Sequence, residues 1–158
     1  MTKRARTLIP LLLLSLTLVS SSLAAQGNQQ KPDVVIGEAV FDERAAAQIL
    51  GVIRDGLEGH SQRLLLSAFD ADKMNSYLTF QDQIEAYFTR YESFRVSYHI
   101  LQTSQENNHG VILADFQIEN EPRGGGRISR RQAQLRFELE HGPKGWKIVD
   151  MDPRGFFF

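Results

Sequence analysis

A change in hydrophobic periodicity near Phe94 constrains the fold of this chain more than any other feature. Before it, apolar residues recur every three or four positions, which is the spacing of amphipathic helices. From Phe94 onward, apolar residues such as Val96 and Tyr98 alternate with polar ones, which is the spacing of half-buried strands. The order predicts an α+β domain, with three N-terminal helices packed on a curved antiparallel sheet of about four or five strands.

Three helices are expected between residues 42 and 91. The first starts after Asp42, is weakened at Gly56 and ends near Gly59. The second spans about 61–69. The third starts at Thr79, where Asp82 three residues later resembles a capping box. The apolar stripe of the third helix consists of Phe80, Ile84, Tyr87, Phe88 and Tyr91.

The last two strands form a hairpin whose register can be predicted. The second strand of the sheet, 111–119, turns Ile112, Ala114, Phe116 and Ile118 to one face. The third strand turns Ala133, Leu135, Phe137 and Leu139 to one face. A loop at 141–144 would place Leu139 opposite Trp146, Phe137 opposite Ile148 and Leu135 opposite Asp150. This register puts Asp150 on the apolar inner face.

The N-terminus has the layout of a secretory signal peptide. Lys3, Arg4 and Arg6 precede an apolar run of about a dozen residues, followed by small residues up to Ala25. A retained membrane anchor is the alternative, but this run is shorter than the ~20 residues that a spanning helix needs. We therefore expect a signal peptide at 1–25, a flexible leader at 26–40 and a single domain at 41–158. The protein is then exported, to a bacterial periplasm or the extracellular space.

Composition excludes several classes of function. Loss of the first 25 residues would remove three basic and no acidic residues, so the net charge of −1 would become −4. A mildly acidic chain argues against nucleic-acid binding, and no later segment is apolar enough to span a membrane. The chain has no cysteine, and its histidines lack the spacing of metal ligands, so neither a metal nor another cofactor is expected.

Two segments carry a family resemblance. The helix Phe80-x-x-x-Ile84-x-x-x-Phe88, running into the strand at Phe94, and the terminal segment 145–150 (GWKIVD) resemble the NTF2-like superfamily, including its SnoaL-like branch. The resemblance extends over roughly 41–152. It implies a cone with a pocket at its open end. The superfamily contains isomerases, dehydratases and cyclases as well as binding and assembly domains, so it implies no reaction and no catalytic residue.

Asp150 is the residue that breaks the predicted apolar pocket wall. A carboxylate among apolar groups has a raised pKa and can act as a base or as a hydrogen-bond donor. The alternative is a strand-end carboxylate that caps a turn or pairs with an arginine. The other residues expected to line the pocket are aromatic: Tyr98, Tyr91, Trp146 and Phe88.

The opposite face of the last strands is polar. Arg130, Arg131 and Arg136 form a basic stripe beside Gln132 and Gln134. We interpret Arg130, Gln132, Gln134 and Arg136 as a candidate homodimer interface, the alternative being a solvated face with weak ion pairs. The three phenylalanines at 156–158 are expected to pack against the domain or a partner subunit.

The absence of a recognised acid–base motif favours a non-catalytic module that binds a small apolar ligand or a protein partner. The alternative is a SnoaL-like isomerase, hydratase or cyclase that uses Asp150. A third interpretation is a pure assembly domain whose pocket is filled by its own aromatic side chains.

Overall fold

The computed structural model describes residues 40–158, and the predictions for the signal peptide and the leader up to residue 39 lie outside this range. Three helices come first: α1 (Glu43–Glu58), α2 (Gln62–Leu66) and α3 (Tyr77–Arg90). Four strands follow, β1 (Tyr91–Glu106), β2 (His109–Pro122), β3 (Ser129–Gly142) and β4 (Gly145–Asp152), and then a 3-10 helix, η1 (Arg154–Phe157). The strands form one antiparallel sheet in the order β1-β2-β3-β4. The α+β class is confirmed.

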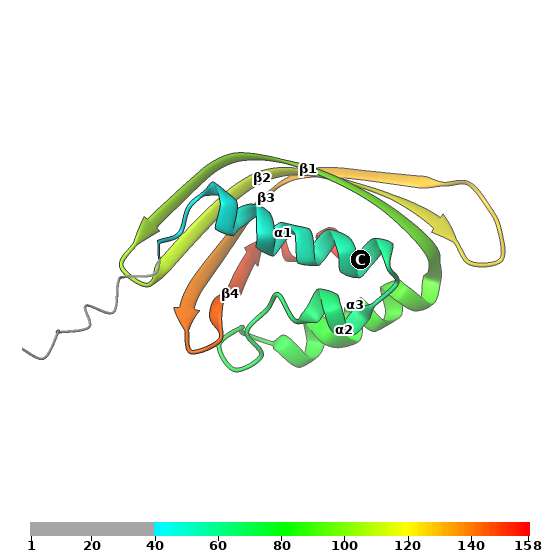
Figure 1. Ribbon diagram of the computed structural model, residues 1–158. Coiled ribbons are helices and arrows are strands. Elements are labelled where there is room, and N and C mark those ends of the chain that lie inside the picture. The colour runs from blue at the N-terminus through cyan, green and yellow to red at the C-terminus, as the bar shows by residue number, and fades with distance from the viewer. Residues whose placement is uncertain (1–39) are drawn as a thin grey trace, which may run out of the picture. The chain divides into compact units, whose positions relative to one another are not determined.

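The helices lie on the concave side of the curved sheet (Figure 1). Asp42 caps α1, since its side chain accepts a hydrogen bond from Ala45 N at 2.8 Å. Ser61 caps α2 in the same way, but α2 ends at Leu66 rather than near Phe69. The predicted capping box at Thr79 is wrong, because α3 begins at Tyr77 after Ser76, which has a φ of 59° and makes no side-chain cap bond. No helix of residues 40–158 is long and apolar enough to cross a membrane.

Buried and more exposed side chains alternate along β2 and β3, and the buried set defines the inner face of the sheet. Ile112, Phe116 and Ile118 on β2 are fully buried, as are Leu135 and Phe137 on β3. Their ladder partners confirm that these residues share a face, since Ile112 lies opposite Phe137 and Ala114 lies opposite Leu135. The predicted faces of both strands are therefore confirmed, with one exception: Arg131 lies opposite the fully buried Ile118 and belongs to the inner face, not to the basic stripe.

The predicted register of the last hairpin is wrong. The loop consists of only Pro143 and Lys144, so Gly142 pairs with Gly145, which has a φ of 81° that suits glycine. Trp146 consequently faces His141, and Ile148 faces Leu139. A register shift between Ile148 and Asp150 inserts one extra residue, Val149, into β4. Asp150 therefore pairs with Glu138 on the outer face, and Met151 takes the inner position opposite Phe137.

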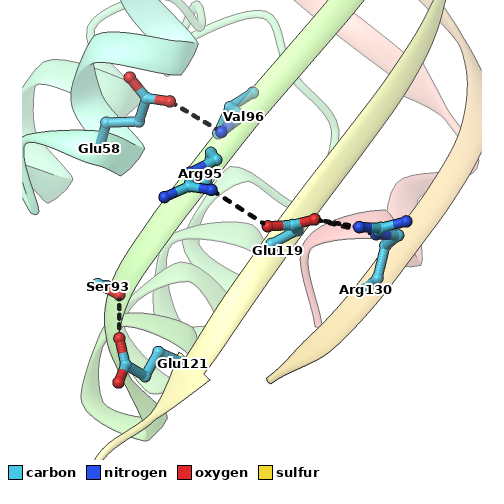
Figure 2. Close-up of polar contacts among 7 residues, drawn as sticks. All are labelled: Glu58, Ser93, Arg95, Val96, Glu119, Glu121 and Arg130. Atoms are coloured by element: carbon cyan, nitrogen blue, oxygen red, sulfur yellow. Dashed lines mark hydrogen bonds and ion pairs between the residues drawn. The ribbon is translucent and has the colours of Figure 1, made fainter.

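Both edges of the sheet carry additional hydrogen bonds. At the β1 edge, Val96 N donates to the Glu58 carboxylate of α1 at 2.8 Å (Figure 2). At the β4 edge, Asp70 N donates to Ile148 O at 2.8 Å, and Ile148 N donates to Ala68 O at 2.9 Å. These bonds cover part of each edge, where exposed groups would otherwise recruit another strand.

Candidate functional site

The interior between the sheet and the helices is filled by aromatic rings. Phe116 on β2 stacks on Tyr98 with ring centroids 5.5 Å apart and meets Phe137 edge-on at 5.9 Å. Phe156 and Phe157 of η1 are buried in the same space, and Phe156 contacts Phe116 at 6.2 Å. The prediction that the terminal phenylalanines pack against the domain is confirmed. The concave side of the sheet is thus occupied by the chain's own side chains.

The four aromatic residues predicted to line a pocket do not gather in one place. Phe88 and Tyr91 both contact Phe94, at 5.2 and 6.2 Å, near the junction of α3 and β1. Tyr98 donates its hydroxyl to Ala47 O of α1 at 3.2 Å. Trp146 instead packs against Phe41 with the ring centroids 4.7 Å apart and the rings tilted, and its buried indole N–H has no acceptor within the described part of the chain.

Asp150 does not lie in the interior. Its carboxylate accepts a hydrogen bond from Arg154 Nε at 2.9 Å and another from its neighbour's backbone, Met151 N, at 2.8 Å. Its side chain is 41% exposed and forms an ion pair with Arg154. The predicted inner-face position is wrong, because the extra residue at Val149 turns this side chain to the other face of the sheet. The alternative, a strand-end carboxylate paired with an arginine, matches the observed contacts.

A polar cluster that sequence reasoning missed lies on the inner face. The hydroxyl of Tyr87 on α3 donates to Asn120 Oδ1 at 2.5 Å, and Asn120 Nδ2 donates to Ser129 Oγ at 3.3 Å. The Arg131 guanidinium lies over the Tyr87 ring, 5.7 Å from its centroid. Asn120 continues the inner-face alternation of β2, and Arg131 that of β3, so the period-two pattern already contained the signal for both residues.

This cluster is not built for acid–base chemistry near neutral pH. Burial raises the pKa of Tyr87 well above its usual range, although Arg131 and the bond to Asn120 oppose the shift. The tyrosine therefore keeps its proton. Among residues 40–158, Asn120 is the one polar or charged residue that is buried, and its amide does not titrate. Within the same range no three His, Cys, Asp or Glu side chains group as metal ligands.

Tyr87→Phe should lower the free energy of unfolding by about 2 kcal/mol at neutral pH, because it removes the donor to the buried Asn120 oxygen. Since the native pKa of Tyr87 is raised above its ordinary value of 10.0, the stability that this group contributes is complete below about pH 10 and is lost as the pH rises further. Urea titrations should therefore show a smaller difference in unfolding free energy between the wild type and Tyr87→Phe at about pH 11 than at about pH 7. The same difference at both pH values would contradict this account.

The outer face of the sheet carries the other predicted residues. Arg130, Gln132, Gln134 and Arg136 are all exposed along β3. Glu119 on β2 connects three strands, because it accepts from Arg130 Nε at 3.0 Å and lies 3.9 Å from Arg95 Nη1 on β1 (Figure 2). In the ladder, Gln117 lies opposite Gln132 and Asp115 lies opposite Gln134. A shallow hollow of about 230 Å³ lies over this central region, lined in part by His99, Asp115 and Gln132.

Comparison with known proteins identifies the fold of this chain. No protein-family model and no curated protein sequence matches the chain. Solved structures do: a conserved protein from Planctomyces limnophilus aligns with a TM-score of 0.63 at 14% identity, over 70% of this chain and 92% of its own. An NTF2-like superfamily protein from Salmonella enterica aligns with a TM-score of 0.61 at 10% identity, over 68% and 86%. The chain has the NTF2-like fold.

The NTF2-like neighbours do not share one type of function. A hexachlorocyclohexane dehydrochlorinase also aligns, with a TM-score of 0.54 at 15% identity, over 68% of this chain and 81% of its own. At such identities the likeness extends to the fold and not to a reaction. Any activity of this NTF2-like domain has to be argued from its own interior and its own surface.

Proposed function

We propose that this protein is an exported, non-catalytic protein-interaction module whose partner is a second copy of itself, bound through the outer face of the sheet. The filled interior carries this proposal. Phe116, Phe137 and Phe157 are fully buried there, and the buried Tyr87–Asn120 pair is neutral and hydrogen-bonded. Export rests on the signal-peptide pattern of residues 1–25.

The enzyme alternative, a SnoaL-like isomerase, hydratase or cyclase, needs a titrating group beside a bound substrate. Asp150, the residue proposed for that role, pairs with Arg154 on the outer side of the sheet. Among the described residues, no carboxylate or imidazole is buried with the aromatic core. These observations favour interaction over catalysis.

The outer face offers charge complementarity to a second copy. Glu119 lies beside Arg130 in the ladder, and Arg136 follows six residues further along β3. Glu119 and Arg136 are thus roughly 20 Å apart along the strands and about 4.8 Å apart across them. A twofold axis in the plane of the face, drawn at right angles to the line between these two residues, would set Glu119 of each copy over Arg136 of the other. Both copies then use the same surface patch, and each contact is made twice in reciprocal form, as a closed twofold dimer requires.

The same operation brings further polar groups of the two copies together. Arg130 falls near Asp152, which is exposed and lies opposite Arg136 in the ladder. The glutamines at 117, 132 and 134 meet one another at the centre, where amide groups can donate and accept. The strands of the two copies would cross at about 25–30°, which is the angle at which aligned sheets usually pack.

A charge exchange between two variants tests this arrangement. Glu119→Arg alone and Arg136→Glu alone each set like charges against each other twice in a homodimer, so each should weaken dimerisation at least ~10-fold. An equimolar mixture of the two variants should restore it, because the arginine introduced in one chain then faces the glutamate introduced in the other. Sedimentation velocity and native mass spectrometry give the dimer fraction and the composition.

Glu85→Arg is the matched control, since this exposed residue lies on α3, away from the sheet face. It should leave dimerisation unchanged. A monomeric wild-type protein at micromolar concentration would refute the second copy as partner. A mixture that stays monomeric while the wild type dimerises would refute the proposed alignment.

A further inference from the structure

The segment after β4 occupies the interior as a ligand would. Phe156 is buried against Phe116, and the ring of Phe158 lies edge-on to Phe80 of α3 at 6.3 Å. Arg131 Nη1 donates to two main-chain oxygens of this segment, Phe156 O at 3.1 Å and Phe158 O at 2.5 Å. The segment thus presents aromatic rings to Phe116 and Phe80, and it presents oxygen acceptors to Arg131.

The guanidinium of Arg131 can bind a carboxylate in place of these two oxygens. It is half-buried on the inner face, and its guanidinium lies over the Tyr87 ring. No side-chain carboxylate of residues 40–158 lies within ion-pair distance of it, whereas Arg130 next to it pairs with Glu119. A guanidinium often binds a carboxylate through two parallel N–H···O bonds, which add geometric specificity as well as energy.

The occupying segment is anchored inside by the fully buried Phe157 and is also held from outside the site. Arg154 pairs with Asp150 and donates through Nη1 to Asn75 O at 3.2 Å. Both contacts involve exposed side chains, and exposed ion pairs are weak. The tether raises the local concentration of the segment to the millimolar range, so a free ligand must compete with it.

We propose that Arg131, Tyr87, Phe80 and Phe116 form a binding site for an aromatic carboxylate, which residues 154–158 occupy as an intramolecular substitute. The ring of the ligand takes the place of Phe156 or Phe158, and its carboxylate takes the place of their main-chain oxygens on Arg131. The site goes beyond the proposed interaction function and does not depend on dimerisation.

N-acetylphenylalanine is the probe, and N-acetylalanine, which lacks the ring, is the ligand control. Phe158→Ala weakens the occupying segment at a half-buried position. This variant should bind the probe at least ~10-fold more tightly than the wild type in saturation-transfer NMR and calorimetry. Arg154→Ala, which loosens the segment without touching the site, should tighten binding about fivefold. Arg44→Ala is its control, because Arg44 is also exposed but lies on α1.

Arg131→Met in the Phe158→Ala background should abolish binding of the probe while the far-ultraviolet circular dichroism stays native. Retention of binding in this double variant would overturn the role of Arg131. Failure of both Phe158→Ala and Arg154→Ala to bind the probe at millimolar concentration would overturn the site itself. Equal binding of N-acetylalanine would overturn the aromatic part of the proposal.

Discussion

Phe116→Ala should lower the free energy of unfolding by about 4 kcal/mol, the largest effect that we expect from a single truncation. The side chain is fully buried and is surrounded by three other rings, those of Tyr98, Phe137 and Phe156. These rings come from β1, β3 and η1, so no single movement can close the cavity that alanine would leave. The loss therefore includes both the transfer of the ring from water and the residual cavity.

Urea unfolding of the wild type and the variant measures this loss. Leu101→Ala is the matched control, since it also truncates an apolar side chain on the sheet but one that is 43% exposed. We expect a change below about 0.5 kcal/mol there. A loss below about 2 kcal/mol for Phe116→Ala would mean that the interior is loosely filled, and it would weaken the case for a non-catalytic domain.

Periodicity in the sequence was sufficient to predict the faces of β2 and β3. Along a strand without a bulge, parity assigns each side chain to one face, so Ile112, Phe116 and Ile118 share a side. Parity also assigns Arg131 to that side. Grouping it with Arg130 and Arg136 by charge, and not by position, put it on the wrong face.

The last hairpin was not predictable by the same rule. A two-residue loop in place of a four-residue loop moves the register by two and preserves every face. The extra residue at Val149 is different, because it reverses parity for everything after it. Nothing in the local sequence marks this irregularity, so the one carboxylate predicted for the pocket, Asp150, was assigned to the wrong side.

The helical half was predictable in its buried faces but not in its close contacts. Ala46, Leu50, Ile53 and Leu57 are buried as the helical spacing of α1 predicts. Gly56 was interpreted as a weak point in the helix, because glycine has low helix propensity. The structure gives it a second role. A Cβ atom at this position would lie 2.5 Å from the backbone nitrogen of Leu65, so Gly56 allows α2 to approach α1 closely.

Gly56→Ala should therefore destabilise the protein by about 3 kcal/mol even though alanine is the better helix former, because Leu65 backbone atoms cannot move without displacing α2. Gly51→Ala on the same helix should stabilise it by about 0.5–1 kcal/mol, since the nearest atom to its new Cβ, the Tyr98 hydroxyl oxygen, is 4.0 Å away. Urea unfolding of the two variants compares the same chemical change at two positions. Opposite signs of the change in unfolding free energy would establish that close approach of the helices, not helix propensity, determines the residue at position 56. If both substitutions stabilise the protein, α2 is free to move away from α1.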